Sequence, residues 1–236
     1  MQLFYLISLS TIGQTFEILD QENQHLVKVL RKNVGDEIFI TNGNGQLFAA
    51  RINAIGKRKS TLEIIKLIKS EETTHNLSIA IAPTKNISRI EWFIEKSVEI
   101  GIHEIFLFAS QNSERRIVKA DRLQTKAISA MKQSLKTQLP EIIDVQKFDK
   151  LIRTISENFD EKYIAYCEEN DLRFVENLQI NKKTIILIGP EGGFTQEEVN
   201  LAKQFGFKTV SLGASRLRTE TAGIFACSVF NALNQS

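Results

Sequence analysis

Residues 189–194, with the sequence GPEGGF, are the first of two C-terminal segments whose residue types and spacing are suited to chemistry. They follow the apolar residues 184–188 and precede Thr195 and Glu198, which have the spacing of a helix capping box. This pattern predicts a buried strand, a glycine-rich loop and a helix start, at the edge where open α/β sheets bind ligands. Glycines in such a loop allow a ligand to approach the backbone.

The residues of this loop limit the kind of ligand that it can bind. It has neither the G-x-G-x-x-G pattern of dinucleotide-binding proteins nor a phosphate-binding loop that ends in Gly-Lys-Ser/Thr. Glu191 disfavours a bare phosphate, so a ligand with hydroxyls, an amine or a positive centre fits better. The alternative is a tight connection that needs its glycines only to turn.

Residues 211–222, with the sequence SLGASRLRTETA, form the second segment. They follow a strand around Val210 and lead into a C-terminal helix that ends near Leu233, with Thr219 as the expected N-cap. Two arginines, a glutamate and two threonines are costly to bury unless they are paired. The alternative is an exposed, capped helix start that is held by a local Arg–Glu pair.

The elements that must position these loops follow an α/β pattern, in which apolar strands alternate with helices from residue 77 onward. We therefore predict an α/β domain with a mainly parallel sheet. The expected strands lie at 77–82, 104–108, 163–166, 184–188 and 209–212, and the clearest helices at 88–100 and 119–137.

The N-terminal part of the chain has a different pattern, because it is rich in short runs of β-branched and aromatic residues. Residues 42–45, NGNG, are a strong hairpin turn between two such runs. These features predict a small β-barrel domain at 1–70, a linker at 70–76 and the α/β domain at 71–236. The expected elements of the small domain are strands at 1–9, 37–41, 46–52 and 60–68 and a helix at 20–31.

The composition, with 42% hydrophobic and 25% charged residues, is ordinary for a soluble globular protein. The only cysteines are Cys167 and Cys227, so we expect no disulfide framework and a reducing compartment, the cytoplasm. No metal-ligand spacing of histidine and cysteine occurs, and we expect no metal. No apolar run approaches the length of a membrane span, and the N-terminus lacks the basic region and cleavage site of a secretion signal.

Charge is segregated along the chain. Residues 111–139 hold seven basic residues and two acidic ones, whereas residues 157–178 hold seven acidic residues and two basic ones. This segregation indicates a basic face that can bind a polyanion. An ordinary solvated helix face is an equally good interpretation of the charge alone.

The two loops together are far more specific than either one. Residues 189–194 followed by Leu-Gly-x-x-x-Leu-Arg-Thr-Glu-Thr-Ala at residues 212–222 resemble the SPOUT class of methyltransferases. Within this class they resemble the ribosomal small-subunit (16S) RNA uridine-N3 methyltransferase family, RsmE. Residues 25–31, Gly35-Asp36 and residues 42–45 are similar to that family's PUA-like RNA-binding domain, and residues 92–101 to the first helix of its catalytic domain.

Three positions depart from the family's usual pattern. Asn42 stands where the family usually has aspartate, and Ile100 where leucine is commoner. Lys136 occupies a position that is often arginine, so it keeps the charge but loses the bidentate fork for a phosphate.

The resemblance implies a SPOUT-type sheet with a C-terminal trefoil knot, a rare exception to the unknotted rule. It implies that three knot loops bind S-adenosylmethionine, that the protein is a homodimer, and that its partner is ribosomal RNA or the 30S subunit. The cofactor-binding residues that it implies are Cys167, Ile188, Gly189, Pro190, Glu191, Gly192, Gly193, Ser211, Leu212, Gly213, Leu217, Arg218, Thr219 and Ala222.

The implied reaction is methyl transfer to N3 of a uridine, which must be unpaired or extruded to expose that nitrogen. Our hypothesis is that Arg218 stabilises the anion of the deprotonated base and that Glu220 accepts or relays the proton. The alternative is that the two form a salt bridge that shapes the knot. Candidate RNA contacts are Lys28, Arg31, Arg51, Lys57, Arg58 and Lys59 in the first domain and Arg115, Arg116 and Lys132 in the second.

Two other functions compete with this one. A non-catalytic RNA-binding or ribosome-assembly factor on the same scaffold is disfavoured, because a scaffold has no need of Gly192-Gly193 and residues 218–220. A nucleotide- or dinucleotide-binding enzyme is disfavoured by the missing phosphate-binding patterns.

Overall fold

The computed structural model describes residues 2–71, 77–166 and 172–234. Its contacts divide the chain into two compact units. The first comprises residues 1–73 together with residues 131–139, and the second comprises residues 74–130 and 140–236. Each unit has its own hydrophobic core.

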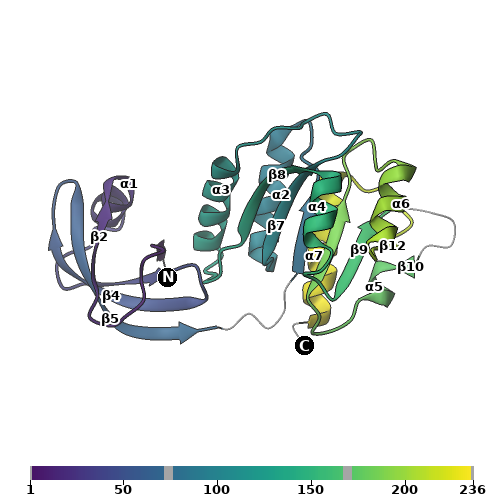
Figure 1. Ribbon diagram of the computed structural model, residues 1–236. Coiled ribbons are helices and arrows are strands. Elements are labelled where there is room, and N and C mark those ends of the chain that lie inside the picture. Colours follow the sequence, from purple (N-terminus) through teal and green to yellow (C-terminus); the bar gives the residue numbers. More distant parts are fainter. Residues whose placement is uncertain (1, 72–76, 167–171, 235–236) are drawn as a thin grey trace. The chain divides into compact units, whose positions relative to one another are not determined.

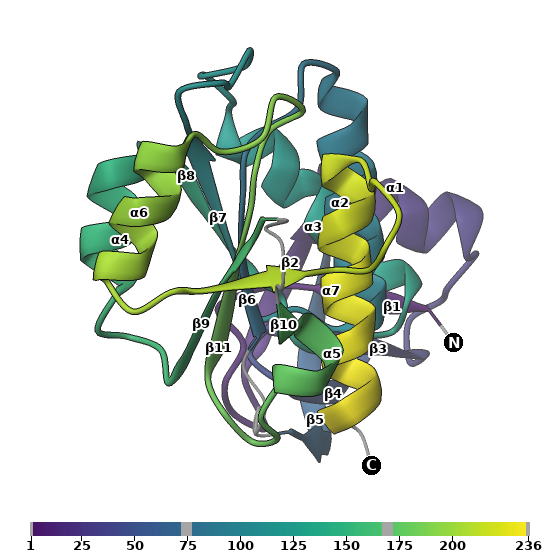
Figure 2. The same ribbon diagram turned by 90° about the vertical axis from the view of Figure 1, so that its right-hand side faces the viewer.

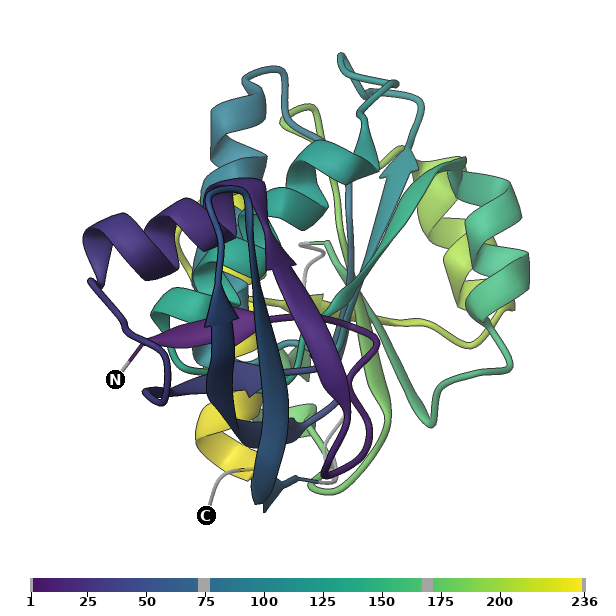
Figure 3. The ribbon, with the colours of Figure 1, turned by 90° about the vertical axis from the view of Figure 1, so that its left-hand side faces the viewer.

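The first unit is built on a curled five-stranded sheet with the strand order β1-β3-β4-β5-β2 (Figures 1 and 3). The pairing of β1 with β3 is parallel and the others are antiparallel. In the described residues β1 and β2 are the two edges, so the expected barrel is an open, curled sheet around an apolar core. Its strands are β1 (Leu3–Tyr5), β2 (Thr15–Leu19), β3 (Glu37–Thr41), β4 (Gln46–Ile55) and β5 (Lys59–Ser70).

The hairpin turn at residues 42–45 is confirmed, since it joins β3 to its antiparallel neighbour β4. The Asn42 side chain accepts a hydrogen bond from the backbone N–H of Asn44 at 2.9 Å, which stabilises the turn locally. Gly43 and Gly45 have φ angles of 79° and 84°, a region that favours glycine.

Residues 131–139 follow a stretch of the second unit in the sequence, but they belong to the first unit and contact its sheet. The backbone N–H of Gly45 donates to the carbonyl of Thr137 at 3.0 Å, and that of Leu139 donates to Gly43 at 2.8 Å. The Thr137 hydroxyl donates to Glu71 at 2.7 Å. The sequence pattern did not predict this return.

The helix expected at 20–31 is not a single α-helix. It consists of α1 (Asp20–Gln24) followed by one π-helical turn, η1 (His25–Val29). Arg31 has a φ of 53°, which ends the helical segment. The apolar spacing of Leu26, Val27 and Leu30 is common to both kinds of helix at this length, so it could not distinguish them.

The second unit contains a seven-stranded, entirely parallel sheet with the order β10-β12-β9-β11-β6-β7-β8. The mainly parallel sheet is therefore confirmed. Its strands are β6 (Leu77–Ile81), β7 (Glu104–Ala109), β8 (Glu141–Lys147), β9 (Glu161–Ala165), β10 (Leu172–Arg173), β11 (Thr184–Ile188) and β12 (Lys208–Ser211). Strands β8 and β10 were not predicted.

Helices cover both faces of this sheet (Figure 2). On one face α4 and α6 pack together over an aromatic-rich core. On the other face α7 packs against α2, α5 and the central strands β6 and β11. The helices are α2 (Ile87–Ile100), α3 (Ala120–Gln133), α4 (Phe148–Ile155), α5 (Phe174–Asn177), α6 (Gln196–Gln204) and α7 (Thr219–Asn234).

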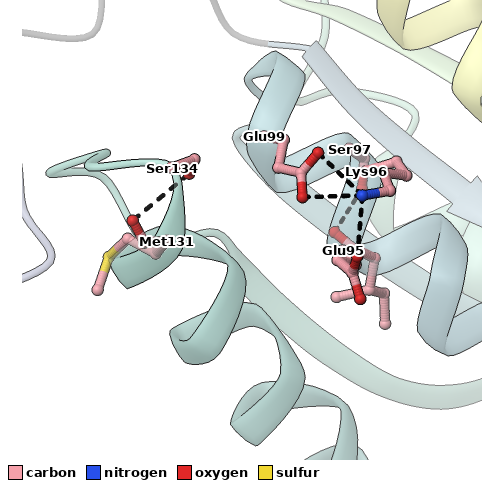
Figure 4. Close-up of polar contacts among 7 residues, drawn as sticks. Glu95, Lys96, Ser97, Glu99, Met131 and Ser134 are labelled. Atoms are coloured by element: carbon pink, nitrogen blue, oxygen red, sulfur yellow. Dashed lines mark hydrogen bonds and ion pairs between the residues drawn. The ribbon is translucent and has the colours of Figure 1, made fainter.

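Helix α3 ends four residues before its expected end at residue 137, because Leu135 adopts a φ of 57°. The backbone N–H of Lys136 then donates to the carbonyl of Met131 at 3.0 Å. The Ser134 hydroxyl donates to the same carbonyl at 3.4 Å (Figure 4).

The close packing of α2 and α7 depends on Gly223. A Cβ atom at this position would lie 2.5 Å from Cε2 of Phe93, a fully buried residue of α2. Farther along, the Asn231 side chain donates to the carbonyl of Gly101 at 2.7 Å. On α2 itself Lys96 lies between Glu95 and Glu99, whose hydrogen bonds raise the pKa of its ammonium group (Figure 4).

Candidate active site

A cavity of about 490 Å³ lies at the carboxyl ends of β9, β11 and β12. Three segments line it: the end of β9, the GPEGGF loop, and residues 213–222 with the start of α7. It therefore brings together the two loops that the sequence singled out. The predicted residues that line it are Ile188, Gly189, Pro190, Glu191, Gly192, Gly193, Gly213, Leu217, Thr219 and Ala222.

Four predicted cofactor residues do not line this cavity or cannot be placed in it. Cys167 lies outside the described residues. Ser211 and Leu212 are half-buried, and the Ser211 hydroxyl accepts a hydrogen bond from the N–H of Gly213 at 3.2 Å. Arg218 lines a second cavity, described below. Neighbouring residues of a loop point to different sides of the backbone. The sequence alone could not show which of them point into the cavity.

The two loops are joined directly by Thr219. Its hydroxyl donates to the carbonyl oxygen of Gly189 at 3.0 Å. Thr219 is the first residue of α7 and not the residue before it, so the expected N-cap role is corrected: the hydroxyl serves the neighbouring loop. The hydrogen bond from the N–H of Tyr166 to the carbonyl of Val210, at 3.2 Å, joins the third segment to the second loop.

The GPEGGF loop is anchored at both ends. Phe194 is buried, and its ring stacks on Phe108 with centroids 6.0 Å apart. A Cβ atom on Gly189 would lie 3.0 Å from this ring, so a larger residue there would press on Phe194. The capping box of Thr195 and Glu198 is confirmed and begins α6 immediately after the loop.

Residues that the sequence did not point to also hold the loop. The Asn112 side chain donates to the carbonyls of Gly192 and Gly193, at 3.2 and 3.1 Å. The backbone N–H of Lys85 donates to Oε1 of Glu191 at 3.1 Å. Asn112 and Lys85 are far from the loop in sequence, so no local signal could have identified them.

Glu191 gives the cavity its electrostatic character. Its second carboxylate oxygen, Oε2, is buried and has no hydrogen-bond partner within the described part of the chain. A buried, unpartnered carboxylate oxygen is costly. A ligand with a cationic or N–H group would satisfy it, which agrees with the ligand class expected from the sequence.

A second cavity, of about 300 Å³, is lined by Ser88, Arg89 and Trp92 of α2 and by Arg218, Glu220 and Thr221. Glu220 is buried, and its Oε1 lies 3.7 Å from Nε of Arg89. Arg218 is exposed and makes no ion pair in the described residues. The alternative of an Arg218–Glu220 salt bridge is thus wrong, since the partner of Glu220 comes from α2.

Comparison with known proteins agrees with this geometry. A family model described as an RNA methyltransferase domain matches residues 70–231, and one described as an RNA methyltransferase PUA domain matches residues 18–65. The ribosomal RNA small subunit methyltransferase E of Bacillus subtilis is 30% identical, over 92% of this chain and 90% of its own length. That of Rickettsia conorii is 31% identical, over 94% of this chain and 91% of its own.

The chain belongs to the ribosomal RNA small subunit methyltransferase E family. Solved structures of similar proteins have the same fold. A probable rRNA-methyltransferase from Porphyromonas gingivalis is 37% identical with a TM-score of 0.88, over 100% of this chain and 99% of the other. The family member from Neisseria gonorrhoeae, solved bound to S-adenosyl methionine, is 27% identical with a TM-score of 0.88, over 99% and 98%.

The basic residues proposed for RNA contact fall into two groups. Lys28, Arg31, Lys57 and Arg58 are exposed and make no ion pair within the described residues. The others are already engaged. Arg51 pairs with Glu37 at 3.3 Å and Lys59 with Glu17 at 2.7 Å, while Lys132 pairs with Glu22 at 2.5 Å.

Arg115 and Arg116 use their guanidinium groups on the backbone. Arg115 donates to the carbonyls of Thr84 and Lys85, with the shortest contact at 2.6 Å. Arg116 donates to the carbonyl of Gln111 at 2.9 Å. Both therefore shape the segments beside the GPEGGF loop, whatever else they contact.

No group of three or more potential metal-binding His, Cys, Asp or Glu side chains occurs in the described part of the chain. None of the helices within residues 2–71, 77–166 and 172–234 is long and apolar enough to cross a membrane.

Proposed function

We propose that this protein transfers a methyl group from S-adenosylmethionine to N3 of a single uridine in small-subunit (16S) ribosomal RNA. The observation that carries the proposal is the cavity at the carboxyl ends of β9, β11 and β12, where both loops meet. Membership of an rRNA methyltransferase family supplies the reaction class. We also propose that the protein acts in the cytoplasm, where ribosomal subunits are assembled.

The residues of the first cavity fit S-adenosylmethionine. Gly192, Gly193 and Gly213 leave the backbone accessible, and the unpartnered Oε2 of Glu191 suits the ammonium group or the sulfonium centre. Leu217 and Ala222 supply apolar contacts for the adenosine part. When bound, S-adenosylmethionine supplies an electrophilic methyl group and retains the electrons of the broken carbon–sulfur bond on its sulfur.

The chain's own residues must make uracil N3 nucleophilic, because this nitrogen carries a proton at neutral pH. In our proposal Glu220 accepts that proton, and N3 then uses the freed electron pair to bond the methyl carbon. Arg218 stabilises the negative charge that spreads over N3, O2 and O4 during the transfer. Glu220 is buried and Arg218 exposed, which suits a proton acceptor and a group that meets the incoming RNA.

The proposal includes three structural features that the family resemblance implies. The C-terminal loops form a trefoil knot, the protein works as a homodimer, and the first domain at 1–70 binds RNA while the domain at 71–236 catalyses. Lys28, Arg31, Lys57 and Arg58 are the first-domain residues best suited to phosphate, because their charges are exposed.

Primer extension on ribosomal RNA tests the reaction and its position together. Methylation at N3 blocks base pairing, so RNA from cells with the protein should stop reverse transcriptase at one uridine, and RNA from cells without it should not. A stop that disappears on deletion and returns on complementation supports the proposal. Identical stops in the two RNA samples would exclude the uridine-N3 assignment.

A further inference from the structure

Residues 110–116, the segment that follows β7, contact the GPEGGF loop from outside the first cavity. None of these residues lines the cavity, whereas Gly192, Gly193 and Phe194 do. The side-chain amide of Asn112 donates to the carbonyl oxygens of Gly192 and Gly193, at 3.2 and 3.1 Å. Of the two ends of an asparagine amide only the NH2 can bond carbonyls, so the orientation of this amide is fixed.

The segment is itself held in place, which makes Asn112 a pre-organised donor. The Ser113 hydroxyl accepts a hydrogen bond from the N–H of Ser110 at 2.9 Å, and both serines are buried. The N–H of Gln111 donates to Oε1 of Glu198 at 2.8 Å. The other carboxylate oxygen of Glu198 belongs to the capping box of α6. One carboxylate therefore joins the start of α6 to the segment that carries Asn112.

The GPEGGF loop needs an outside contact because its own sequence leaves the backbone free. Two successive glycines can adopt many backbone conformations, and Gly193 has a φ of 71°. Among the described residues 190–194, only the N–H of Gly193 donates to another backbone group, the carbonyl of Pro190 at 2.9 Å. A Cβ atom on Gly192 would lie 3.0 Å from Cβ of Asn112. The absence of a side chain at Gly192 therefore allows the close approach of Asn112.

The bond to the Gly193 carbonyl also fixes the next N–H group. In a trans peptide the C=O and N–H point to opposite sides, so the N–H of Phe194 points away from the Asn112 amide. This N–H makes no hydrogen bond within the described residues. Since Phe194 lines the first cavity, its N–H is a donor that a ligand in this cavity can use.

We propose that Asn112 is a positioning residue for S-adenosylmethionine. It holds two carbonyl oxygens on the outer side of the loop and so keeps the N–H of Phe194 available to the cofactor. Without Asn112 the peptide between Gly193 and Phe194 can turn over, and it then presents a carbonyl oxygen in place of that N–H. The inference rests on the proposed function, because it needs the first cavity to bind the cofactor.

Two substitutions at Asn112 test the role of its N–H groups. Asn112→Ala removes the amide, and Asn112→Asp keeps its shape but cannot donate when it is ionised. We expect both to weaken S-adenosylhomocysteine binding by about three- to thirtyfold in titration calorimetry. The matched control is Asn158→Ala, at an exposed asparagine whose amide donates to the carbonyl of Thr154 at 3.4 Å. An Asn112→Asp variant that binds as tightly as the wild type would overturn the proposal.

Kinetics separate positioning from a general structural role. KM for S-adenosylmethionine should rise in both variants, whereas kcat at saturating cofactor should stay within about twofold of the wild type. Because Asn112 is exposed, the thermal midpoint of the unliganded protein should hardly change. A midpoint that falls together with kcat would mean that the substitution disrupts the segment as a whole, and the proposal fails.

The backbone amide of Phe194 gives a readout that does not depend on activity. In protein labelled with heavy nitrogen at its phenylalanines, Phe194→Leu identifies the resonance of this amide. We expect saturating S-adenosylhomocysteine to shift the resonance in the wild type, because a new hydrogen bond forms, and to shift it far less in Asn112→Ala. The absence of a shift in the saturated wild type would refute the role of this N–H.

The same measurements distinguish failure of this inference from failure of the proposed function. A wild-type protein that binds neither S-adenosylmethionine nor S-adenosylhomocysteine refutes the function. A wild-type protein that binds both, with unchanged affinity in the two Asn112 variants, refutes the positioning role alone.

Discussion

The Thr219 hydroxyl donates a hydrogen bond to the carbonyl oxygen of Gly189, at 3.0 Å, and so joins the loop after β12 to the loop after β11. Both loops line the first cavity, and the bond fixes the distance between its two walls. We therefore expect the affinity for S-adenosylmethionine to depend on the Thr219 side chain through its contact with the opposite wall of the cavity.

Thr219→Val should weaken S-adenosylmethionine binding by about three- to tenfold, since a lost neutral hydrogen bond costs about 0.5–1.5 kcal/mol. Titration calorimetry measures the change. Thr154→Val is the control, because Thr154 is an exposed residue of α4 whose hydroxyl makes only a local bond to the carbonyl of Lys150. An unchanged dissociation constant in the Thr219 variant would mean that this bond does not hold the cavity.

Glu191→Gln should weaken S-adenosylmethionine binding by about ten- to a hundredfold, because the bond from a cationic ligand to Oε2 loses its charge. Methylthioadenosine, which lacks both the ammonium and the sulfonium, should bind the variant and the wild type equally well. Glu157→Gln, on an exposed residue, is the control. Equal losses for both ligands would show that the substitution disturbs the loop.

Arg218→Ala should abolish turnover and leave S-adenosylmethionine affinity nearly intact, because Arg218 lines the second cavity and not the first. Single-turnover methylation and calorimetry measure the two quantities on one preparation. Arg173→Ala, which removes an exposed arginine paired with Glu176, should change neither. If cofactor binding collapses with turnover, Arg218 has a structural role.

Gly223→Ala should destabilise the protein by about 1–3 kcal/mol, because the new methyl group would lie 2.5 Å from the ring of Phe93 in the closed α2–α7 contact. In a helix interior, alanine is otherwise about 1 kcal/mol more favourable than glycine. Chemical denaturation measures the sign of the change in the free energy of unfolding. A stabilised variant would show that the two helices can move apart at no cost. Ser228→Ala, at an exposed residue of α7, is the control.

RNA affinity should fall steeply with salt, and Lys57→Ala should reduce the slope of log K against log salt by about 0.7–0.9. Lys57 is exposed and makes no ion pair within the described residues, so its charge is available to a phosphate. Lys150→Ala, at an exposed residue of α4, removes the same charge elsewhere and should leave the slope unchanged. Equal slopes in wild type and Lys57→Ala would remove Lys57 from the RNA contacts.

The sequence predicted the parts of the site whose signals are local. The Thr195–Glu198 capping box is dictated by backbone geometry within one turn, and it is confirmed. Strands β6, β7 and β11 were found because continuous apolar runs are typical of buried parallel strands.

The parts that were missed depend on residues far apart in the chain. Asn112 reaches the carbonyls of Gly192 and Gly193, and Arg89 lies beside Glu220, only because the strand order places their elements together. The alternative reading of the sequence paired Glu220 with Arg218, its near neighbour in the chain. At the start of α7 successive side chains face different cavities, so proximity in sequence did not mean contact.

The return of residues 131–139 to the first sheet means that neither domain is one continuous stretch of chain. A gene fragment that stops after residue 70 would lack the carbonyl of Thr137, to which the Gly45 N–H and the Thr41 hydroxyl donate. Exchange of this N-terminal module between enzymes would need more than one fusion point. A functional transfer of the first domain to another protein must include residues 131–139 as well. We therefore expect the two domains to be inherited together.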